Sequence, residues 1–560
     1  MITILLLMTK LLSNGGSRHS ATRRLAFWPA RARQRVWLRR TGGFVTRKNI
    51  VLILPDQLRP DFLGCYGADW LQTPAIDALA SSSVRYTAAV SSAPLCVPAR
   101  NALLTGMHPL RTGVLANDQG LRPDYRQMGI ETWADRLSSA GYVTASIGKM
   151  HFYPWDAGYG FHHRVIAEDK RHIAIRDDYD AYLRRHGLAK THANTWPEYH
   201  ESRGATPPPV PWEHSVDHFV GTAAQEFIAS RTGCDEPFAM MVGFPGPHCP
   251  YDPVPEFLDR VDRDRVPIAR PGSADHAPER VQAARDSYLR AWADLDLSEF
   301  PDEARAQVRA HYSALVMQVD HEVGRVLQAI DEAGLAEDTI VILASDHGDF
   351  LGDRELLGKA MFHEESVRVP MMIRIPGHVP GINNAMVDLY DLAPTMLELV
   401  GAGVPEQMDA RAVPGLSGLE AESRERVVGA VADGWMLREG GMVLHKYGTG
   451  EVLLYDHDAD PEQIRDLSRD PAHRADLDRM DATLTREVMA LVASGHEDKI
   501  GSSTEPEFYA RGWQRPYPYP VKSFVRPESA RAAARSDATR ARDVSTSGAS
   551  TPSATSLSSA

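Results

Sequence analysis

Groups able to transfer protons or bind ions recur in this chain directly after apolar, β-branched runs. Four sets stand at the ends of predicted strands: Asp56-Gln57 after 49–54, Lys149 and His151 after 142–147, His248 after 237–244, and Asp346-His347 after 339–344. Ligands of α/β proteins gather outside the carboxyl ends of parallel strands, so we expect these side chains to converge. Histidines there would suit proton transfer, because the imidazole pKa lies near neutral pH.

A second chemical feature is Cys96, one of only four cysteines. Pro98 suits the first turn of a helix running to Leu104, which would place Cys96 where free N–H groups favour an anion. Arg100 follows one helical turn later and is expected beside Cys96 rather than in a surface salt bridge. For an isolated cysteine, a buried thiol at a helix start would be the ordinary interpretation.

The motif around this cysteine changes that interpretation. Cys96-Val97-Pro98-Ala99-Arg100, followed by Leu103-Leu104-Thr105-Gly106, resembles the signature of the type I sulfatases of the alkaline-phosphatase superfamily. The resemblance extends from Asn49 to about Ser494. Further motifs agree in order: 49–57 with Gly64-Cys65-Tyr66-Gly67, Gly148-Lys149-Met150-His151, Pro247-His248, and Ser345-Asp346-His347-Gly348-Asp349 to Gly358-Lys359. It implies a sulfuric ester hydrolase that releases sulfate and an alcohol from a small-molecule sulfate monoester.

The resemblance also implies a set of roles. Cys96 would be oxidised by a formylglycine-generating enzyme, a partner during maturation, to formylglycine, whose hydrate is the nucleophile. One divalent metal would be bound by Asp56, Gln57, Asp346, His347 and an oxygen of the modified Cys96. The implied catalytic residues besides Cys96 are Arg100, Lys149, His151, His248 and Lys359. Asn117 and His363 are the two further candidates for contacts with the substrate.

The metal motifs depart from the commonest sulfatase pattern. Many sulfatases carry Asp-Asp and Asp-Asn where this chain has Asp56-Gln57 and Asp346-His347, a pattern similar to the choline-sulfatase and phosphonate-monoester-hydrolase branches. An imidazole nitrogen suits a transition metal, so Mn²⁺ stands beside Ca²⁺, with Mg²⁺ as a further candidate. Hydrolysis of phosphonate monoesters or phosphodiesters is the alternative function. A non-enzymatic binding protein with unmodified Cys96 is disfavoured, because the ligand set is intact.

Composition excludes other classes of function. The net charge is −13 although residues 1–48 contain eleven Lys or Arg and no acidic residue, so the remaining chain is strongly acidic. Such a body offers no basic stripe for nucleic acid. After residue 48 the chain has no run of 18 apolar residues, so we expect no membrane span. Four scattered cysteines favour a reducing compartment, and the weak N-terminal signal favours the cytoplasm over secretion or the periplasm.

Alternating apolar strands and amphipathic helices predict an α/β fold with a large mixed, mostly parallel sheet flanked by helices, alkaline-phosphatase-like by the resemblance. We expect a catalytic domain over 49–404 and a small α+β domain over 405–500, with strands at 426–432, 441–447 and 451–455 and a helix at 461–494. Residues 1–48 are expected to be a disordered basic extension or to precede the true start, and 501–560 a mostly disordered tail. The alcohol part of the substrate and a homo-oligomeric state are left open.

Overall fold

The computed structural model describes residues 47–168, 172–270, 277–290 and 292–497. The expectations for the N-terminal extension and the C-terminal tail fall almost entirely outside these residues.

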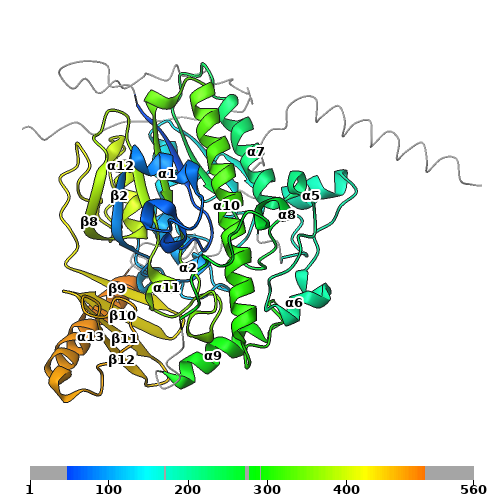
Figure 1. The fold of residues 1–560 in the computed structure, drawn as a ribbon. Helices are drawn as coiled ribbons and strands as arrows, with labels where there is room; N and C mark the ends of the chain where they lie inside the picture. Colours follow the sequence, from blue (N-terminus) through cyan, green and yellow to red (C-terminus); the bar gives the residue numbers. More distant parts are fainter. Residues whose placement is uncertain (1–46, 169–171, 271–276, 291, 498–560) are drawn as a thin grey trace, which may run out of the picture. The chain divides into compact units, whose positions relative to one another are not determined.

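A large sheet of eight strands forms the centre of the fold (Figure 1), in the order β4-β3-β5-β1-β6-β7-β2-β8. In chain order the strands are β1 (Asn49–Ile53), β2 (Val84–Val90), β3 (Val143–Gly148), β4 (His163–Ile166), β5 (Phe238–Gly243), β6 (Thr339–Ala344), β7 (Met371–Arg374) and β8 (Gly381–Asp388). Only the pairs that β7 makes with β6 and β2 are antiparallel. The predicted fold class is confirmed.

Helices cover both faces of this sheet. In chain order, the helices of all the described residues are α1 (Pro74–Ser81), α2 (Cys96–Thr105), α3 (Pro109–Thr112), α4 (Trp133–Ser139), α5 (Asp178–Arg185), α6 (Pro197–Glu201), α7 (Val216–Ala229), α8 (Pro255–Leu258), α9 (Pro278–Tyr288), α10 (Asp302–Glu332), α11 (Glu364–Val367), α12 (Leu392–Leu399) and α13 (Arg474–Glu497). Val51 and Ile53 of β1 pack in one apolar cluster with α7 and α10, whereas Ile50 and Leu52 pack in the opposite cluster with α4 and α12. Because side chains alternate across a strand and both faces are covered, β1 is apolar from Ile50 to Ile53.

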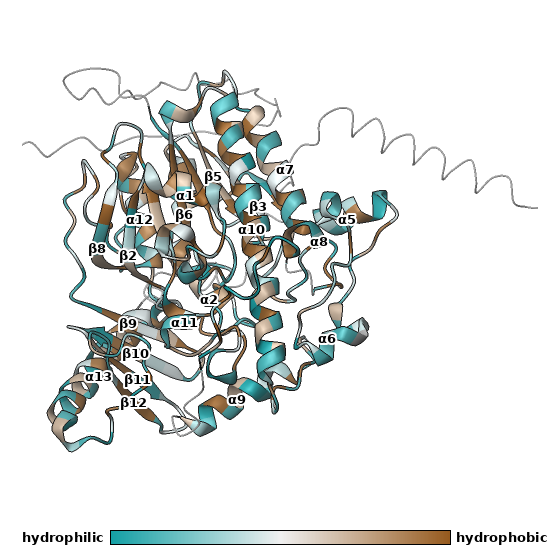
Figure 2. Cartoon of the chain, in the orientation of Figure 1, coloured by the Kyte–Doolittle hydropathy of each residue, from teal (hydrophilic) through white to brown (hydrophobic). Residues whose placement is uncertain are grey.

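A second, antiparallel sheet follows, in the order β12-β11-β10-β9. Its strands are β9 (Arg426–Val431), β10 (Gly434–Glu439), β11 (Met442–Tyr447) and β12 (Val452–Asp456). One face packs through Leu437 and Leu444 on Met480 of α13. The other packs through residues such as Tyr455 on Phe362, which follows β6 in the chain. Figure 2 shows both brown, hydrophobic segments and pale or teal segments in these strands. The domain boundary expected near residue 404 stays a prediction.

Two local expectations need correction. The helix predicted over 461–494 begins only at Arg474. Pro471 has no N–H for a helical bond, Asp470 caps a short turn by accepting the Ala472 N–H, and the Leu467 N–H donates to the carbonyl of Leu454 in β12. Strands β4, β8 and β10 were not predicted. β4 and β8 are the two edges of the large sheet, where polar residues are tolerated and the apolar pattern is weak.

Candidate active site

Helix α2 presents Cys96 at its first position. The helix starts two residues before Pro98 and ends at Gly106, whose φ of 64° is left-handed. The Val97 N–H, free at a helix start, donates to Asn117 Oδ1 at 3.0 Å. Cys96 is 1% exposed, so its Sγ lies at the positive end of a buried helix.

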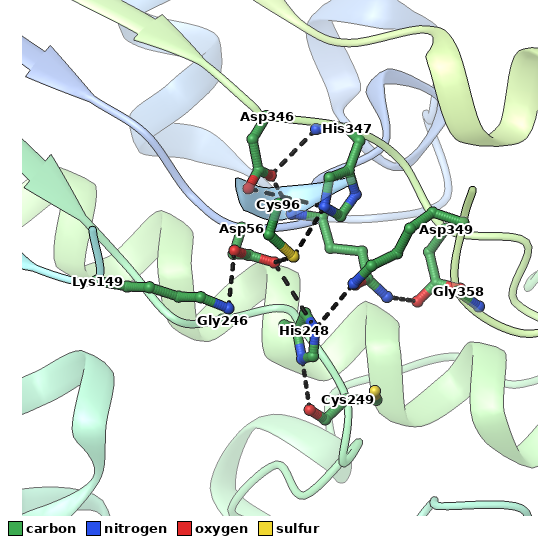
Figure 3. A network of polar contacts seen from close by, with 12 residues as sticks. Asp56, Cys96, Lys149, Gly246, His248, Cys249, Asp346, His347, Asp349 and Gly358 are labelled. Atoms are coloured by element: carbon green, nitrogen blue, oxygen red, sulfur yellow. Dashed lines mark hydrogen bonds and ion pairs between the residues drawn. The ribbon is translucent and has the colours of Figure 1, made fainter. Parts of the chain in front are cut away.

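Two neighbouring strand ends bring carboxylates to this sulfur. Asp56 follows β1 and Asp346 follows β6, which pair in parallel. Cys96 Sγ lies 3.9 Å from Asp56 Oδ1 and 3.2 Å from His347 Nε2. One ligand atom of each of these four residues lies within 4.8 Å of the others (Figure 3). We call Asp56, Cys96, Asp346 and His347 the Cys96 cluster; it is fully buried and has the donor set of a metal site.

Two cations pair with the carboxylates of this cluster. Arg100 bridges them, with Nη2 at 2.9 Å from Asp56 Oδ2 and Nε at 2.8 Å from Asp346 Oδ2. Lys149 Nζ lies 2.9 Å from the same Asp56 oxygen. Arg100 is 2% exposed, so it makes no surface salt bridge. Charges buried to this depth are stable only when they are paired and hydrogen-bonded.

The surroundings shift the pKa of each group in the cluster. Burial alone would raise the pKa of Asp56, but the charges of Lys149 and Arg100 hold it well below its usual range. Burial would likewise raise the pKa of the Cys96 thiol, and the charges of Lys359 and Lys149 bring it well below the ordinary value. For Asp346 burial outweighs Arg100, so its pKa is raised. Positive groups around residue 96 thus lower the pKa of the thiol in the unmodified chain.

Two histidines turn the same ring nitrogen toward the site. The Nδ1 of His347 lies 2.9 Å from the carbonyl of Gly348, and the Nδ1 of His248 lies 2.6 Å from the carbonyl of Cys249. Each carbonyl accepts a hydrogen bond, so the proton of the neutral ring sits on Nδ1 and Nε2 keeps its lone pair. The Nε2 of His347 faces Cys96, and the Nε2 of His248 lies 2.9 Å from Lys359 Nζ.

Gln57, directly after Asp56, and Lys359, from the segment that follows β6, join the site. Lys359 Nζ donates to Gln57 Oε1, while Gln57 Nε2 donates to Asp349 Oδ2. The backbone of Gln57 is left-handed, with a φ of 70°. The structure thus brings Gln57, Lys359 and His248 together beside the Cys96 cluster.

His151 approaches from the end of β3. Its side chain helps to lower the pKa of the Cys96 thiol. Its backbone N–H donates to Glu168 Oε2 at 3.1 Å, and its own φ is 56°. Lys149 and His151 thus both act on groups of the Cys96 cluster from the end of β3.

The two candidate substrate contacts lie in different surroundings. Asn117 caps α2 next to Cys96, as described above. His363 is buried among aromatic rings, with its Nε2 at 3.4 Å from the hydroxyl of Tyr455 and its ring centroid at 5.0 Å from that of His445. His363 thus packs against the small sheet. Their roles in binding substrate stay predictions, as do the catalytic roles assigned above.

Several residues that build the site were missed by sequence reasoning. Asp349 stands inside a quoted motif but received no role, although its carboxylate binds Gln57. Tyr312 of α10 was assigned no role either, yet its hydroxyl donates to the carbonyl of Gln57 at 2.7 Å. Glu168 and Asp217 hold the loops of His151 and His248, the latter by accepting the Gly246 N–H at 2.9 Å. No spacing in the chain marks these two.

Comparison with known proteins agrees with the geometry of the site. The profile of the sulfatase family matches residues 48–402. The chain belongs to the sulfatase family. This sulfatase is a sulfuric ester hydrolase, and the predicted family is confirmed.

Its relatives include sulfatases that are named for different substrates. It is 26% identical over 478 residues to an arylsulfatase of Clostridium perfringens, covering 79% of this chain and 94% of the relative. It is 29% identical over 461 residues to a choline-sulfatase of Rhizobium meliloti, covering 79% of this chain and 86% of that protein. The similarity therefore extends over most of the length of both relatives.

Solved structures agree on the fold. The phosphonate monoester hydrolase of Silicibacter pomeroyi superimposes with a TM-score of 0.67 at 24% identity, covering 79% of this chain and 96% of that one. The enzyme of the same name from Agrobacterium radiobacter gives a TM-score of 0.66 at 24% identity, covering 80% and 96%. Among the described residues of this sulfatase, no helix is both long and apolar enough to span a membrane.

Proposed function

We propose that this sulfatase hydrolyses sulfate monoesters of small molecules through a formylglycine formed from Cys96 and one divalent metal ion. The observation that carries the proposal is the position of Cys96, at the buried start of α2, within hydrogen-bonding reach of His347 and close to Asp56. Buried cations surround it, which suits an anionic substrate in an otherwise acidic protein.

The residues present fit a metal. Asp56 and Asp346 supply two carboxylates, and the carbonyl of Gly348 fixes the tautomer in which His347 Nε2 faces the cluster. Gln57 adds an amide oxygen next to them. A divalent ion held there would supply Lewis-acid stabilisation of the charge that develops on the sulfuryl oxygens. Ca²⁺, Mn²⁺ and Mg²⁺ are the candidates, and the imidazole favours Mn²⁺.

Residue 96 supplies the nucleophile. Its oxidation needs a formylglycine-generating enzyme, which provides the oxidant and removes the sulfur, and the hydrate of the aldehyde then offers an oxygen nucleophile. Arg100 holds both carboxylates of the cluster and fixes the geometry around residue 96. Lys149 and Lys359 place two ammonium groups near the transferred anion, where charge-assisted hydrogen bonds are strongest.

Two histidines take part in proton transfer. His151, which helps to lower the pKa of the Cys96 thiol, takes a proton from residue 96. His248 Nε2 and Lys359 Nζ share a hydrogen bond of 2.9 Å, so this pair can deliver a proton to the departing alcohol oxygen. Water is consumed, and sulfate, the alcohol and one proton are released.

The alternative is hydrolysis of phosphonate monoesters or phosphodiesters. Gln57 and His347, in place of the commoner Asp and Asn, favour it, whereas Lys149 and His151 favour sulfate. Initial rates on paired aryl sulfate, phosphonate monoester and phosphodiester substrates decide between them. A wild-type preference for the diester would overturn the proposal.

Two measurements test the proposed chemistry directly. Mass spectrometry of the Cys96 peptide from active enzyme should show an aldehyde-reactive residue without sulfur; an intact thiol in fully active enzyme would contradict this. Elemental analysis should find one divalent metal per chain and a large loss in Asp346→Ala. Unchanged metal content in that variant would refute the ligand assignment. We place the enzyme in the cytoplasm, which fractionation tests.

A further inference from the structure

Asp349 lies fully buried beside the proposed reaction centre. Its Oδ1 accepts the backbone N–H groups of Gly358, at 2.7 Å, and Leu351, at 3.1 Å. Its Oδ2 accepts Gln57 Nε2 and the hydroxyl of Tyr251, the latter at 2.7 Å. This one carboxylate therefore ties the loop of Lys359 to the side chain of Gln57.

The backbone of Gln57 leaves only its amide free to reorient. The Gln57 N–H donates to Asp346 Oδ1 at 3.0 Å, and its carbonyl accepts the hydroxyl of Tyr312 at 2.7 Å. The residue is held in the left-handed region, at a φ of 70°. A rotation of the terminal amide by half a turn would exchange its oxygen and nitrogen without moving the chain.

The partners of that amide permit one orientation. A carboxylate only accepts hydrogen bonds and an ammonium only donates them, so Gln57 Nε2 must face Asp349 and Oε1 must face Lys359. We infer that Asp349 is a positioning residue: it fixes the orientation of the Gln57 amide and, through it, the place of Lys359 Nζ. The inference rests on the proposed function, in which Lys359 acts at the anion and the leaving oxygen.

The substitution Asp349→Asn reverses this orientation. Two fixed backbone N–H groups need the oxygen of the new amide at the Oδ1 position, so its NH₂ takes the place of Oδ2 and faces Gln57. The hydroxyl of Tyr251 can rotate to accept from that NH₂, but the amide of Gln57 must flip. Its own NH₂ then confronts Lys359 Nζ, donor against donor, and displaces the lysine from its position beside His248.

The second substitution, Gln57→Glu, supplies a matched rescue. In the double variant, one oxygen of the new carboxylate at position 57 accepts from the amide at position 349, and the other accepts from Lys359. One negative charge has moved from position 349 to position 57 and the total is unchanged. Gln57→Glu alone sets two carboxylates face to face, so each single change is unfavourable and the pair is complementary.

The experiment is a double-mutant cycle with two readouts, turnover of an aryl sulfate and the unfolding midpoint of the metal-free protein. Asp349→Asn should lower kcat roughly 10²-fold, the scale of one lost charge-stabilising donor, with a smaller change in KM. The double variant should regain about tenfold or more and raise the unfolding midpoint above that of both single variants. Tyr251→Phe, which removes a different donor to the same oxygen, should keep kcat within about threefold.

Wild-type kcat in Asp349→Asn, or a double variant no better than the worse single one, would overturn the inference. An equal loss in Tyr251→Phe would also overturn it, because the role would then be general support of the loop. If the wild-type protein fails on every sulfate ester, the proposed function falls. The unfolding midpoints of the metal-free variants still decide the orientation of Gln57 in that case.

Discussion

Two buried ionic clusters lie close together in this enzyme, and only one of them contains groups able to react. The Cys96 cluster has been described. The second, which we call the Arg59 cluster, consists of Arg59, Asp353 and Arg309. Arg59 Nη1 lies 2.7 Å from Asp353 Oδ2, and Arg309 Nη1 lies 3.2 Å from Asp353 Oδ1. Burial of charge is thus common to both.

The difference lies in what each side chain can still do. In the Arg59 cluster the cations are guanidiniums, which stay charged at every accessible pH, and Asp353 also accepts the Arg270 N–H at 2.6 Å. Burial would raise the pKa of Asp353, but Arg59 and Arg309 lower it. The Cys96 cluster contains a thiol and an imidazole, and Lys149 lies beside it; the protonation states of these groups can change. Exchangeable protons, rather than buried charge, mark the reactive cluster.

The two clusters are also joined. Arg59 Nη1 donates to the carbonyl of Asp349 at 2.9 Å, so the Arg59 cluster anchors the loop from which Asp349 reaches Gln57. We therefore expect changes in the Arg59 cluster to act on stability and changes in the Cys96 cluster to act on turnover.

The largest expected effect is that of Cys96→Ala. Removing the proposed nucleophile should lower kcat by at least about 10⁴-fold, the scale seen when a catalytic nucleophile is deleted. The fold should remain, because a small residue at the start of α2 leaves its apolar packing in place. Turnover and the thermal unfolding midpoint are measured on the same preparation. Activity near that of the wild type would show that residue 96 is not the nucleophile.

Next comes Asp353→Asn in the Arg59 cluster. Removing the charge leaves buried Arg309 without its ion-pair partner and leaves Arg59 with Asp61 alone, which should cost about 3–5 kcal/mol in the free energy of unfolding. Well below the lowered unfolding midpoint, kcat/KM on an aryl sulfate should change little. Asp302→Asn, an exposed carboxylate paired with Arg305, is the control and should leave stability nearly unchanged. A loss of kcat/KM in Asp353→Asn as large as the one expected below for Lys149→Ala would show that the two clusters do not differ in this way.

The same comparison shows what a sequence can predict. Asp56, Cys96 and Asp346 were predictable because each stands in a local motif at a strand or helix end, and the strand-end rule then places them together. Asp353 and Arg309 were not, because their pairing joins helix α10 to a segment 44 residues later in the chain and no local spacing records it.

The fold was predictable to a similar limit. Buried central strands such as β1 can be recognised from continuous apolar runs, whereas the edge strands β4 and β8 carry polar residues and were missed. The start of α13 was misplaced because a backbone hydrogen bond between Leu467 and Leu454 overrides the helical pattern of the preceding residues. Pro471 was the available local signal.

Lys149→Ala tests how much a cation beside the Cys96 cluster contributes to turnover. It should lower kcat/KM on a sulfate monoester roughly 10²-fold, the usual scale for one charge-stabilising donor. A phosphodiester should suffer less, because it presents fewer free oxygens to the cations. Lys190→Ala is the matched control: this buried lysine pairs with Asp177 at 2.6 Å and should affect stability more than rate. Equal losses on both substrates would favour the alternative function.

The smallest expected effect concerns acid stability at the small sheet. Burial, with the charges of Arg354 and Arg438 beside it, lowers the pKa of His445 to about 3. In the unfolded chain this imidazole takes up a proton below about pH 6.5, while the folded one stays neutral. Its contribution is therefore complete above that pH and is lost as the pH falls, by about 2 kcal/mol at pH 5. His445→Phe should flatten the fall of the unfolding free energy between pH 7.5 and pH 5 by about this amount, measured by denaturant titration. The same change at exposed His200 should leave the slope as in the wild type, and an unaltered slope in His445→Phe would show that this histidine is not buried in its neutral form.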